Sequence, residues 1–261
     1  MDKIRVGVIG AYGRMGQASC QAIARSSDLE LVWAIDLEGV REPIPGTSLT
    51  IESDFSPQSP LEKAQVLLDF THPSVAASHA VRALQAGVAP IVGTSGLSTG
   101  DLQSLSQLSE EAGVPALVIP NFAIGAVLMI QFAALAARWL PECEIIELHH
   151  ERKVDAPSGT AEYTAEKIAE ARQGHLPPPR DSLLRYPGAR GAKVHGVPIH
   201  SIRLPGKLAH QMVILGAPGE TLTLQHDSTD RSSFMPGVLL AIRKVLSRQG
   251  LAVGLENLLD L

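Results

Sequence analysis

The alternation of short apolar runs with helical segments constrains the fold of this chain more than any other feature. In the first 120 residues, β-branched and other apolar residues gather at positions 6–9, 31–35, 66–70, 90–92 and 116–119. Segments with helical spacing separate these runs, and two of them, 75–86 and 102–112, are followed directly by a glycine that suits a left-handed helix end. Runs that are apolar on both faces are typical of buried parallel strands. The pattern therefore predicts an α/β fold with a doubly wound parallel sheet.

The pattern changes after Asn121. An apolar segment at 125–140 leads to a run at 144–150 whose partial alternation suits a sheet with one covered face, and a helix is expected near 160–172. Three strand candidates then follow one another without a helix between them, at 197–204, 211–215 and 221–227. This order favours antiparallel hairpins and predicts a second, α+β domain with a mixed, mainly open sheet. The expected domain boundaries are 1–121 and 122–231.

The composition excludes several classes of protein. With 45% hydrophobic and 19% charged residues, the 261-residue chain is expected to be globular. Its net charge of −5 lacks the basic surplus of a nucleic-acid-binding protein. Cys20 and Cys143 are the only cysteines and form no CxxC pattern, which argues against a zinc cluster and a disulfide framework. The N-terminus enters a strand-like run without a secretory leader. No apolar run reaches the about 18 residues of a membrane span, so we expect a cytoplasmic protein with no nucleic-acid or membrane partner.

A glycine-rich turn follows the first predicted strand and opens the first predicted helix. It consists of Gly10, Ala11, Tyr12, Gly13, Arg14, Met15 and Gly16. Glycines allow a tight turn and a close backbone approach, and the N–H groups at a helix start attract a pyrophosphate. The turn is therefore a candidate dinucleotide site of a Rossmann-type domain. Because Tyr12 takes the place of the middle glycine in the usual G-x-G-x-x-G spacing, a turn without any ligand is the alternative.

Asp36 ends the second predicted strand, 20 positions after Gly16. An acidic side chain at this place accepts hydrogen bonds from the ribose of a bound adenosine. An ionised Asp36 repels a 2′-phosphate, whereas Arg14 or Arg41 attracts one, so the sequence leaves the choice between NADH and NADPH open. A solvated acidic residue at a strand end is the alternative.

Three further predicted strands end in small, hydroxylated, amide or aromatic residues. The segments are Asp69-Phe70-Thr71-His72-Pro73, Gly93-Thr94-Ser95-Gly96 and Pro120-Asn121-Phe122. Because α/β proteins bind ligands at the carboxyl edge of a parallel sheet, these residues are candidates to border a nicotinamide. Ordinary turn chemistry is the alternative for each segment.

The densest polar cluster spans residues 147–161 and joins a predicted strand to a predicted helix. Ser158 is a candidate N-cap of that helix. The N–H groups of Gly159 and Thr160 then suit a carboxylate, and Lys153 adds a positive charge beside them. A capped helix after a solvated surface loop is the alternative.

Histidines supply the candidate proton-transfer groups. His149 and His150 are adjacent at a strand end and are expected to point to opposite faces, so that one holds a substrate while the other exchanges a proton. The later histidines, His195, His200 and His210, match no compact zinc spacing, and we expect no metal site.

Together these segments resemble the 4-hydroxy-tetrahydrodipicolinate reductase family, also called dihydrodipicolinate reductases, over nearly the whole chain. Residues 149–161 are similar to that family's HHxxKxDAPSGTA motif without a gap, and residues 10–16 are similar to its GxxGRMG turn. The segments at 69–71, 93–96 and 121–122 occur in the family's order.

The resemblance implies an NADPH- or NADH-dependent reduction of 4-hydroxy-2,3,4,5-tetrahydrodipicolinate to 2,3,4,5-tetrahydrodipicolinate, with loss of water, in lysine and diaminopimelate biosynthesis. It implies that His149 is the general acid or base and Lys153 a proton donor. The small dicarboxylate substrate would be bound by His150, Ser158, Gly159 and Thr160. The cofactor would be bound by Gly10, Ala11, Tyr12, Gly13, Arg14, Met15, Gly16, Asp36, Phe70, Gly93, Thr94, Ser95, Asn121 and Phe122. A homotetramer formed through the second domain's sheet is also implied, as is a C-terminal helix, 232–261, that returns to the first domain.

The chain differs from the family's usual pattern at Tyr12, Leu37 and Ser95, which bears on the choice of cofactor and not on the reaction. Two other functions are compatible with the residues alone. One is another two-domain nicotinamide-dependent amino-acid or semialdehyde dehydrogenase, and the other is a non-catalytic dinucleotide sensor.

Overall fold

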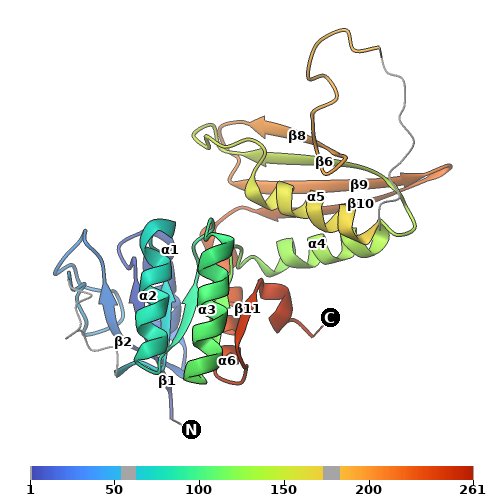
Figure 1. Cartoon of the computed structure of the whole chain (residues 1–261). Helices are drawn as coiled ribbons and strands as arrows, with labels where there is room; N and C mark the ends of the chain where they lie inside the picture. The colour runs from blue at the N-terminus through green and yellow to red at the C-terminus, as the bar shows by residue number, and fades with distance from the viewer. Residues whose placement is uncertain (1, 54–62, 173–182, 261) are drawn as a thin grey trace. The chain divides into compact units, whose positions relative to one another are not determined.

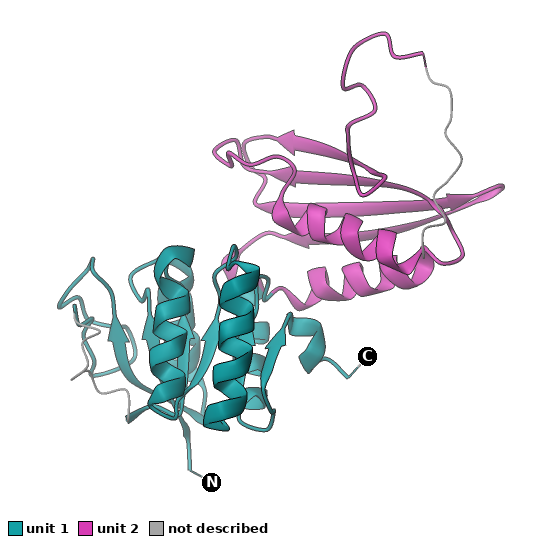
Figure 2. Cartoon of the chain, in the orientation of Figure 1, with its two compact units in different colours: residues 1–122, 234–261 teal, residues 123–233 magenta. Residues whose placement is uncertain are grey.

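The computed structural model of the protein describes residues 2–53, 63–172 and 183–260. The chain forms two compact units. Unit 1 comprises Met1–Phe122 and Phe234–Leu261, and unit 2 comprises Ala123–Ser233 (Figure 2). The two ends of the chain therefore belong to the same unit, and unit 2 is a single insertion between them.

Unit 1 is built on a six-stranded sheet in which all neighbouring strands run parallel (Figure 1). The strands are β1 (Ile4–Ile9), β2 (Leu29–Ile35), β3 (Val66–Asp69), β4 (Ala89–Val92), β5 (Ala116–Val118) and β11 (Leu251–Val253). Their spatial order is β11-β5-β4-β3-β1-β2. The predicted doubly wound parallel sheet is confirmed. Strand β1 lies between β2 and β3, at the point where the strand order reverses, and such a point is the usual place for a ligand in this class of fold.

Helices cover both faces of this sheet. They are α1 (Arg14–Arg25), α2 (Pro73–Gln85), α3 (Thr99–Ala112) and α6 (Met235–Val245). Helix α2 packs beside α3, and α1 packs beside α6. Strands β3, β4 and β5 are buried at every residue, as strands covered on both faces must be. Helix α3 ends at the left-handed Gly113 (φ 64°), as its sequence predicts.

The C-terminal segment 232–261 differs from the single helix expected there. A 3₁₀ turn, η2 (Arg231–Phe234), leads into α6, and the chain then forms β11 and a second 3₁₀ turn, η3 (Leu255–Leu258). Strand β11 pairs in parallel with β5 and forms one edge of the sheet. A strand of three residues is too short to show the alternation of apolar and polar residues that predicts a strand. Its structure therefore depends on pairing with β5. Helix α6 lies so close to the end of the first segment that a Cβ atom at Gly237 would stand 2.0 Å from the carbonyl oxygen of Phe122.

Unit 2 combines a five-stranded mixed sheet with two helices. The strands are β6 (Glu142–His149), β7 (Ala192–Val194), β8 (Val197–Arg203), β9 (Ala209–Ala217) and β10 (Glu220–Ser228), in the order β10-β9-β6-β8-β7. The helices are α4 (Ile124–Ala136) and α5 (Gly159–Ala171), and both lie on the same face of the sheet (Figure 1). The expected α+β domain with a mixed sheet is confirmed.

One expected pairing in this sheet is wrong. The segments 197–204 and 211–215 do not form a hairpin, because β6 lies between β8 and β9. Strand β6 pairs in parallel with β8 and antiparallel with β9. Helix α5 provides the crossover that a parallel β6–β8 pair needs. Strands β9 and β10 do form the hairpin expected of them.

The two faces of the unit 2 sheet differ in burial. Along β6, the buried residues Cys143, Ile145 and Glu147 alternate with partly exposed ones, so the first set faces the helices. Glu147 is the exception in an otherwise apolar set, since its side chain is completely buried. Helix α4 is apolar at every position except Gln131. No helix in the described part of the chain has the length and hydropathy needed to cross a membrane.

Candidate active site

Two glycines of the glycine-rich turn of unit 1, Gly10 and Gly16, leave no room for a side chain. Gly10 has a φ of 77°, which only glycine adopts at low cost, and a Cβ atom there would lie 2.8 Å from the carbonyl carbon of Phe70. A Cβ atom at Gly16 would lie 1.9 Å from the carbonyl oxygen of Gly10. Gly13 begins helix α1 without a side-chain cap. The start of α1 therefore presents backbone N–H groups close to bare backbone, which is the arrangement that a pyrophosphate requires.

Asp36 is attached to this turn. Its carboxylate accepts a hydrogen bond from the backbone N–H of Tyr12 (2.8 Å) and another from that of Glu38 (3.1 Å). The Tyr12 ring packs against the loop after β2, because a Cβ atom at Gly39 would stand 2.1 Å from Tyr12 Cδ2. The aromatic ring that replaces the usual middle glycine thus packs on its own unit, and Asp36 stands at the end of β2, beside the turn.

The ends of β3 and β4 and the segment after β5 come together at one edge of the sheet. The rings of Phe70 and Phe122 meet edge to face with their centroids 5.7 Å apart. Gly93 lies beside both, since a Cβ atom there would stand 2.3 Å from Phe70 Cε1 and 3.0 Å from Phe122 Cε2. Thr94 donates its hydroxyl hydrogen to the carbonyl oxygen of Thr71 at 2.6 Å. The structure therefore assembles these sequence-predicted residues in one place, beside Gly10.

His72 caps the start of helix α2. Its ring nitrogen Nδ1 accepts a hydrogen bond from the backbone N–H of Ser74 (3.3 Å) at the start of α2. Three residues before His72, the buried Asp69 binds His79 Nδ1 at 2.8 Å. These contacts hold the loop after β3 in place.

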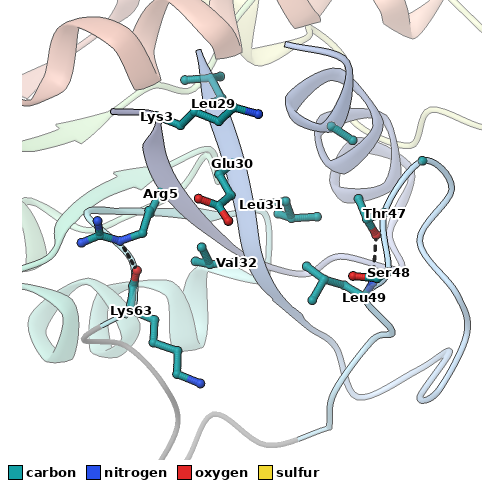
Figure 3. Close-up of a pocket in the computed structure, with 12 residues that line it drawn as sticks. Lys3, Arg5, Leu29, Glu30, Leu31, Val32, Thr47, Ser48, Leu49 and Lys63 are labelled. Carbon is teal, nitrogen blue, oxygen red and sulfur yellow. Dashed lines mark hydrogen bonds between the residues drawn. The ribbon is translucent and has the colours of Figure 1, made fainter. Parts of the chain in front are cut away.

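A separate open pocket lies on another part of unit 1 (Figure 3). Its volume is about 670 Å³, and its lining includes Lys3, Arg5, Glu30 and Lys63. These residues stand at the beginnings of β1 and β2 or next to β3, whereas the glycine-rich turn follows the end of β1. The pocket is thus about 17 Å of strand length from the turn and is not the dinucleotide site.

In unit 2, His149 is held by a buried carboxylate. His149 Nδ1 lies 2.5 Å from Glu147 Oε2. The two residues are two positions apart on β6 and therefore share a face of the sheet. Burial alone would raise the pKa of Glu147, but hydrogen bonds from His149, Arg203 and Ser201 lower it to about 2. Glu147 is therefore ionised at neutral pH.

Arg203 links this pair to the segment that carries Lys153. Its guanidinium donates to both carboxylate oxygens of Glu147 at 2.9 Å and to the backbone oxygen of Asp155 at 2.6 Å. The carboxylate of Asp155 in turn binds Lys153 Nζ at 2.8 and 2.9 Å. Hydrogen bonding to Lys153 lowers the pKa of Asp155. One chain of contacts therefore connects His149 with Lys153.

The start of α5 belongs to the same cluster. Ser158 caps the helix by accepting a hydrogen bond from the backbone N–H of Ala161 at 3.3 Å, as its sequence predicts. Thr164 donates to the carbonyl oxygen of Thr160 (2.7 Å) and accepts from Gln211 Nε2 (2.7 Å). Gln211 stands directly opposite Glu147 in the β6–β9 pair. The first turns of α5 are thus tied to β9, the strand that pairs with β6 and so lies next to the strand of His149.

Three buried polar atoms of this cluster have no hydrogen-bond partner within the described residues. They are His150 Nδ1, Arg203 Nε and Gln211 Oε1. Buried polar atoms without partners are rare in proteins, and they gather at functional sites. His150 can turn toward a ligand without losing a bond from Nδ1.

The other histidines that the sequence singled out are distributed along the sheet. His200 Nε2 lies 2.5 Å from Glu144, and His210 Nδ1 lies 2.6 Å from Asp227. His195 occupies a left-handed turn between β7 and β8 (φ 51°). In the ranges that the structure describes, no three His, Cys, Asp or Glu side chains gather as metal ligands do.

Three residues of this cluster had no role predicted from the sequence: Glu147, Arg203 and Gln211. The position of Glu147 could have been found, because a residue two places before His149 on a strand faces the same way. Arg203 and Gln211 carried no local signal, since their roles depend on the order of the strands in the sheet.

Both parts of the chain match the same family of known proteins. Residues 4–122 match the family model described as "Dihydrodipicolinate reductase, N-terminus", and residues 125–259 match "Dihydrodipicolinate reductase, C-terminus". The chain is 45% identical to the 4-hydroxy-tetrahydrodipicolinate reductase of Bacillus velezensis, with 99% of each chain covered. It is 46% identical to the enzyme of the same name from Syntrophomonas wolfei, again with 99% of each chain covered.

A solved structure agrees with these sequence matches. It is the dipicolinate-bound dihydrodipicolinate reductase of Paenisporosarcina sp. TG-14, with a TM-score of 0.88 and 41% identity. The match covers 98% of this chain and 100% of the other. That protein was solved with an aromatic dicarboxylate.

The lowered pKa of Glu147 predicts an acid-dependent loss of stability. A carboxyl group whose pKa falls from 4.5 to about 2 on folding stabilises the folded state above pH 4.5 and loses that contribution as the pH falls toward 2. Between pH 6 and pH 3 the protein should lose about 2 kcal/mol more of its free energy of unfolding than Glu147→Gln does. Urea unfolding at both pH values measures this difference, and an equal decline in the two proteins would contradict the prediction.

Proposed function

The chain belongs to the dihydrodipicolinate reductase family, and we propose on that basis how its own side chains carry out the reaction. It reduces 4-hydroxy-tetrahydrodipicolinate, a small dicarboxylate, with NADH or NADPH as the reductant, in the biosynthesis of lysine and diaminopimelate. Family models cover both units, so the assignment does not depend on one motif. The roles of individual residues are proposed from the family resemblance, and the geometry of each unit supports them.

Unit 1 is the proposed nucleotide-binding part. The observation that supports the fit is the bare backbone of the turn, where a Cβ atom at Gly16 would overlap the carbonyl oxygen of Gly10. We assign the pyrophosphate to Gly10–Gly16 and the adenosine ribose to Asp36. The nicotinamide is assigned to the sheet edge formed by Phe70, Gly93, Thr94, Ser95, Asn121 and Phe122. When bound, the reduced nicotinamide supplies the hydride.

Unit 2 is the proposed substrate-binding part, and one observation carries this proposal. A continuous set of contacts through Glu147 and Arg203 joins His149, Lys153 and the start of α5. The substrate carries two carboxylates, and the helix start at Ser158, Gly159 and Thr160 suits one of them. A Cβ atom at Gly159 would meet nothing within 4 Å, which supports space for a ligand there. His150, with its unpartnered Nδ1, is assigned to the substrate as well.

Proton handling is assigned to Lys153 and His149. The Lys153 ammonium is 23% exposed and is paired with the more exposed Asp155, so a substrate carboxylate can compete for it at little cost. Its three N–H donors allow it to hold an anion and deliver a proton from Nζ. His149 uses Nδ1 to bind Glu147, which leaves Nε2 as the ring atom that exchanges a proton. Water loss and reduction both require such positioned proton transfer.

Removal of the Lys153 ammonium should abolish most turnover without affecting nucleotide binding. We expect Lys153→Ala to lower kcat at least ~100-fold, in line with the loss of a positioned proton donor. The affinity for NADH, measured by fluorescence titration, should stay within about 2-fold of the unmodified protein because Lys153 belongs to unit 2. Lys167→Ala removes an α5 lysine paired with Glu170 at 2.7 Å and serves as the control with normal kcat. A near-normal kcat for Lys153→Ala would refute the assignment.

Replacing Asp36 should affect the two nicotinamide cofactors unequally. In Asp36→Ala the ribose of NADH loses its acceptor, whereas the 2′-phosphate of NADPH escapes repulsion by the carboxylate. We expect the Kd for NADH to rise about 10-fold relative to the Kd for NADPH, as for one lost hydrogen bond to a charged group. Because Asp36 also binds the backbone N–H of Tyr12, a purely structural role would weaken both cofactors equally. Calorimetric titration of both cofactors separates the two cases.

We propose further that the protein is a homotetramer in the cytoplasm, assembled through the sheet face of unit 2 that α4 and α5 leave uncovered. That face carries the partly exposed apolar residues Ile146, Ile202, Met212 and Ile214. Burial of such residues between subunits is favourable. Both cysteines are free and buried, which is compatible with a reducing compartment.

The oligomer can be tested with one substitution on that face. Light scattering should give four times the chain mass of 27.7 kDa for the unmodified protein, and Ile214→Glu should shift the population to smaller species because it buries an unpaired charge in the interface. A monomer in the unmodified protein would contradict the proposal.

A further inference from the structure

Glu147 is a completely buried carboxylate to which the proposed mechanism gives no step. We propose that Glu147 is a positioning residue for both proton-handling groups of unit 2: it orients His149 directly, and through Arg203 it holds the segment that carries Lys153. This inference rests on the proposed roles of His149 and Lys153. Glu147 itself touches no reacting atom.

The contact with His149 determines which ring nitrogen carries the proton. Glu147 is ionised, because its pKa is lowered to about 2, and an ionised carboxylate only accepts hydrogen bonds. The nitrogen that it contacts at 2.5 Å, Nδ1 of His149, must therefore carry a hydrogen. In the neutral imidazole, Nε2 is then the unprotonated atom, ready to take a proton from a ligand or return it. A single carboxylate thus selects the tautomer and limits rotation of the ring.

The contact with Arg203 extends this control to Lys153. Both terminal nitrogens of Arg203 donate to Glu147, one to each carboxylate oxygen, at 2.9 Å. This two-point contact holds the plane of the guanidinium. The same guanidinium donates to the backbone oxygen of Asp155, whose side chain binds Lys153 Nζ. The Lys153 segment is therefore held by a side chain whose orientation Glu147 sets.

Polar side chains of the two neighbouring strands also surround Glu147. Ser201 and Gln211 flank it on the neighbouring strands, in register with it, and Ser201 donates a hydrogen bond to the carboxylate. A buried carboxylate without partners is strongly disfavoured, so any movement of His149 or Arg203 away from Glu147 raises the energy of the whole cluster. The carboxylate thereby restricts both groups before a substrate binds.

The same strand offers a matched control. Glu144 also contacts a histidine and an arginine, His200 at 2.5 Å and Arg190. It lies three positions before Glu147 and therefore faces the opposite side of the sheet, where it is 31% exposed. Glu144→Gln and Glu147→Gln thus remove the same charge from the same kind of contact, one outside the proposed site and one within it.

The test combines kinetics with ¹⁵N NMR of histidine-labelled full-length protein, with the His149 signals identified by their loss in His149→Gln. The amide of Glu147→Gln can donate to Nδ1 as well as accept from it, so we expect the Nδ1–H form of His149 to give way to a mixture of tautomers. We expect kcat to fall at least about 10-fold, with the KM for NADH within about 2-fold. Glu144→Gln, with its assembly shown by light scattering to be unchanged, should change neither the His149 signals nor kcat.

The outcomes separate a failure of this inference from a failure of the proposed function. Unchanged His149 signals in Glu147→Gln would overturn the inference, whatever the rate. A changed tautomer with normal kcat would confirm that Glu147 orients the ring and would overturn the acid–base role of His149, which belongs to the proposed function.

A second variant tests the link between Glu147 and Lys153. This test can still be made if circular dichroism shows that Glu147→Gln does not fold. Arg203→Lys keeps a cation beside Glu147 but loses the fork that reaches Asp155 at the same time. We expect unchanged His149 signals and a kcat lowered at least about 10-fold. A normal kcat would overturn the link between Glu147 and Lys153.

Discussion

Parallel strands need a crossover between them, and this constraint determines where both candidate sites lie. A parallel pair cannot be closed by a tight turn, so the chain leaves the carboxyl end of one strand and enters a helix before it returns. In unit 1 this occurs between β1 and α1, at the glycine-rich turn. In unit 2 it occurs between β6 and α5, because β6 and β8 are parallel. Each connection ends at a helix start, where unpaired N–H groups suit an anion.

The two connections are stabilised in different ways. The turn in unit 1 depends on missing side chains, since Gly10 and Gly16 approach each other closely enough that a Cβ atom at Gly16 would overlap backbone. The connection in unit 2 is polar and is held by charge. There the buried carboxylate of Glu147 accepts hydrogen bonds from His149 and Arg203. The glycine-rich turn suits a long anionic ligand that is bound by backbone groups. The contacts of Glu147 suit proton transfer, because they keep ionisable side chains in defined orientations.

Much of this arrangement was predictable from local patterns. Apolar runs separated by helical segments predict the parallel sheet of unit 1, and the cap at Ser158 and the left-handed end at Gly113 follow from residue type. The errors have a common cause. The assignment of 232–261 as one helix missed β11, a strand of three residues, and the expected hairpin of 197–204 with 211–215 missed the insertion of β6 between them. In both cases the pairing partner is distant in sequence, and short segments contain no information about it.

The residues of the candidate site also differ in whether a local pattern or the order of the strands identifies them. The sequence alone determined the candidate residues of each connection, His149, Lys153 and the glycine-rich turn among them, because capping, turn formation and strand alternation act over a few neighbouring positions. Only the tertiary structure decided that Arg203 and Gln211 join them, since each reaches the cluster from another strand through the register of the mixed sheet. The order of the strands brings these side chains into contact only in the folded sheet. A local sequence pattern contains no information about such contacts.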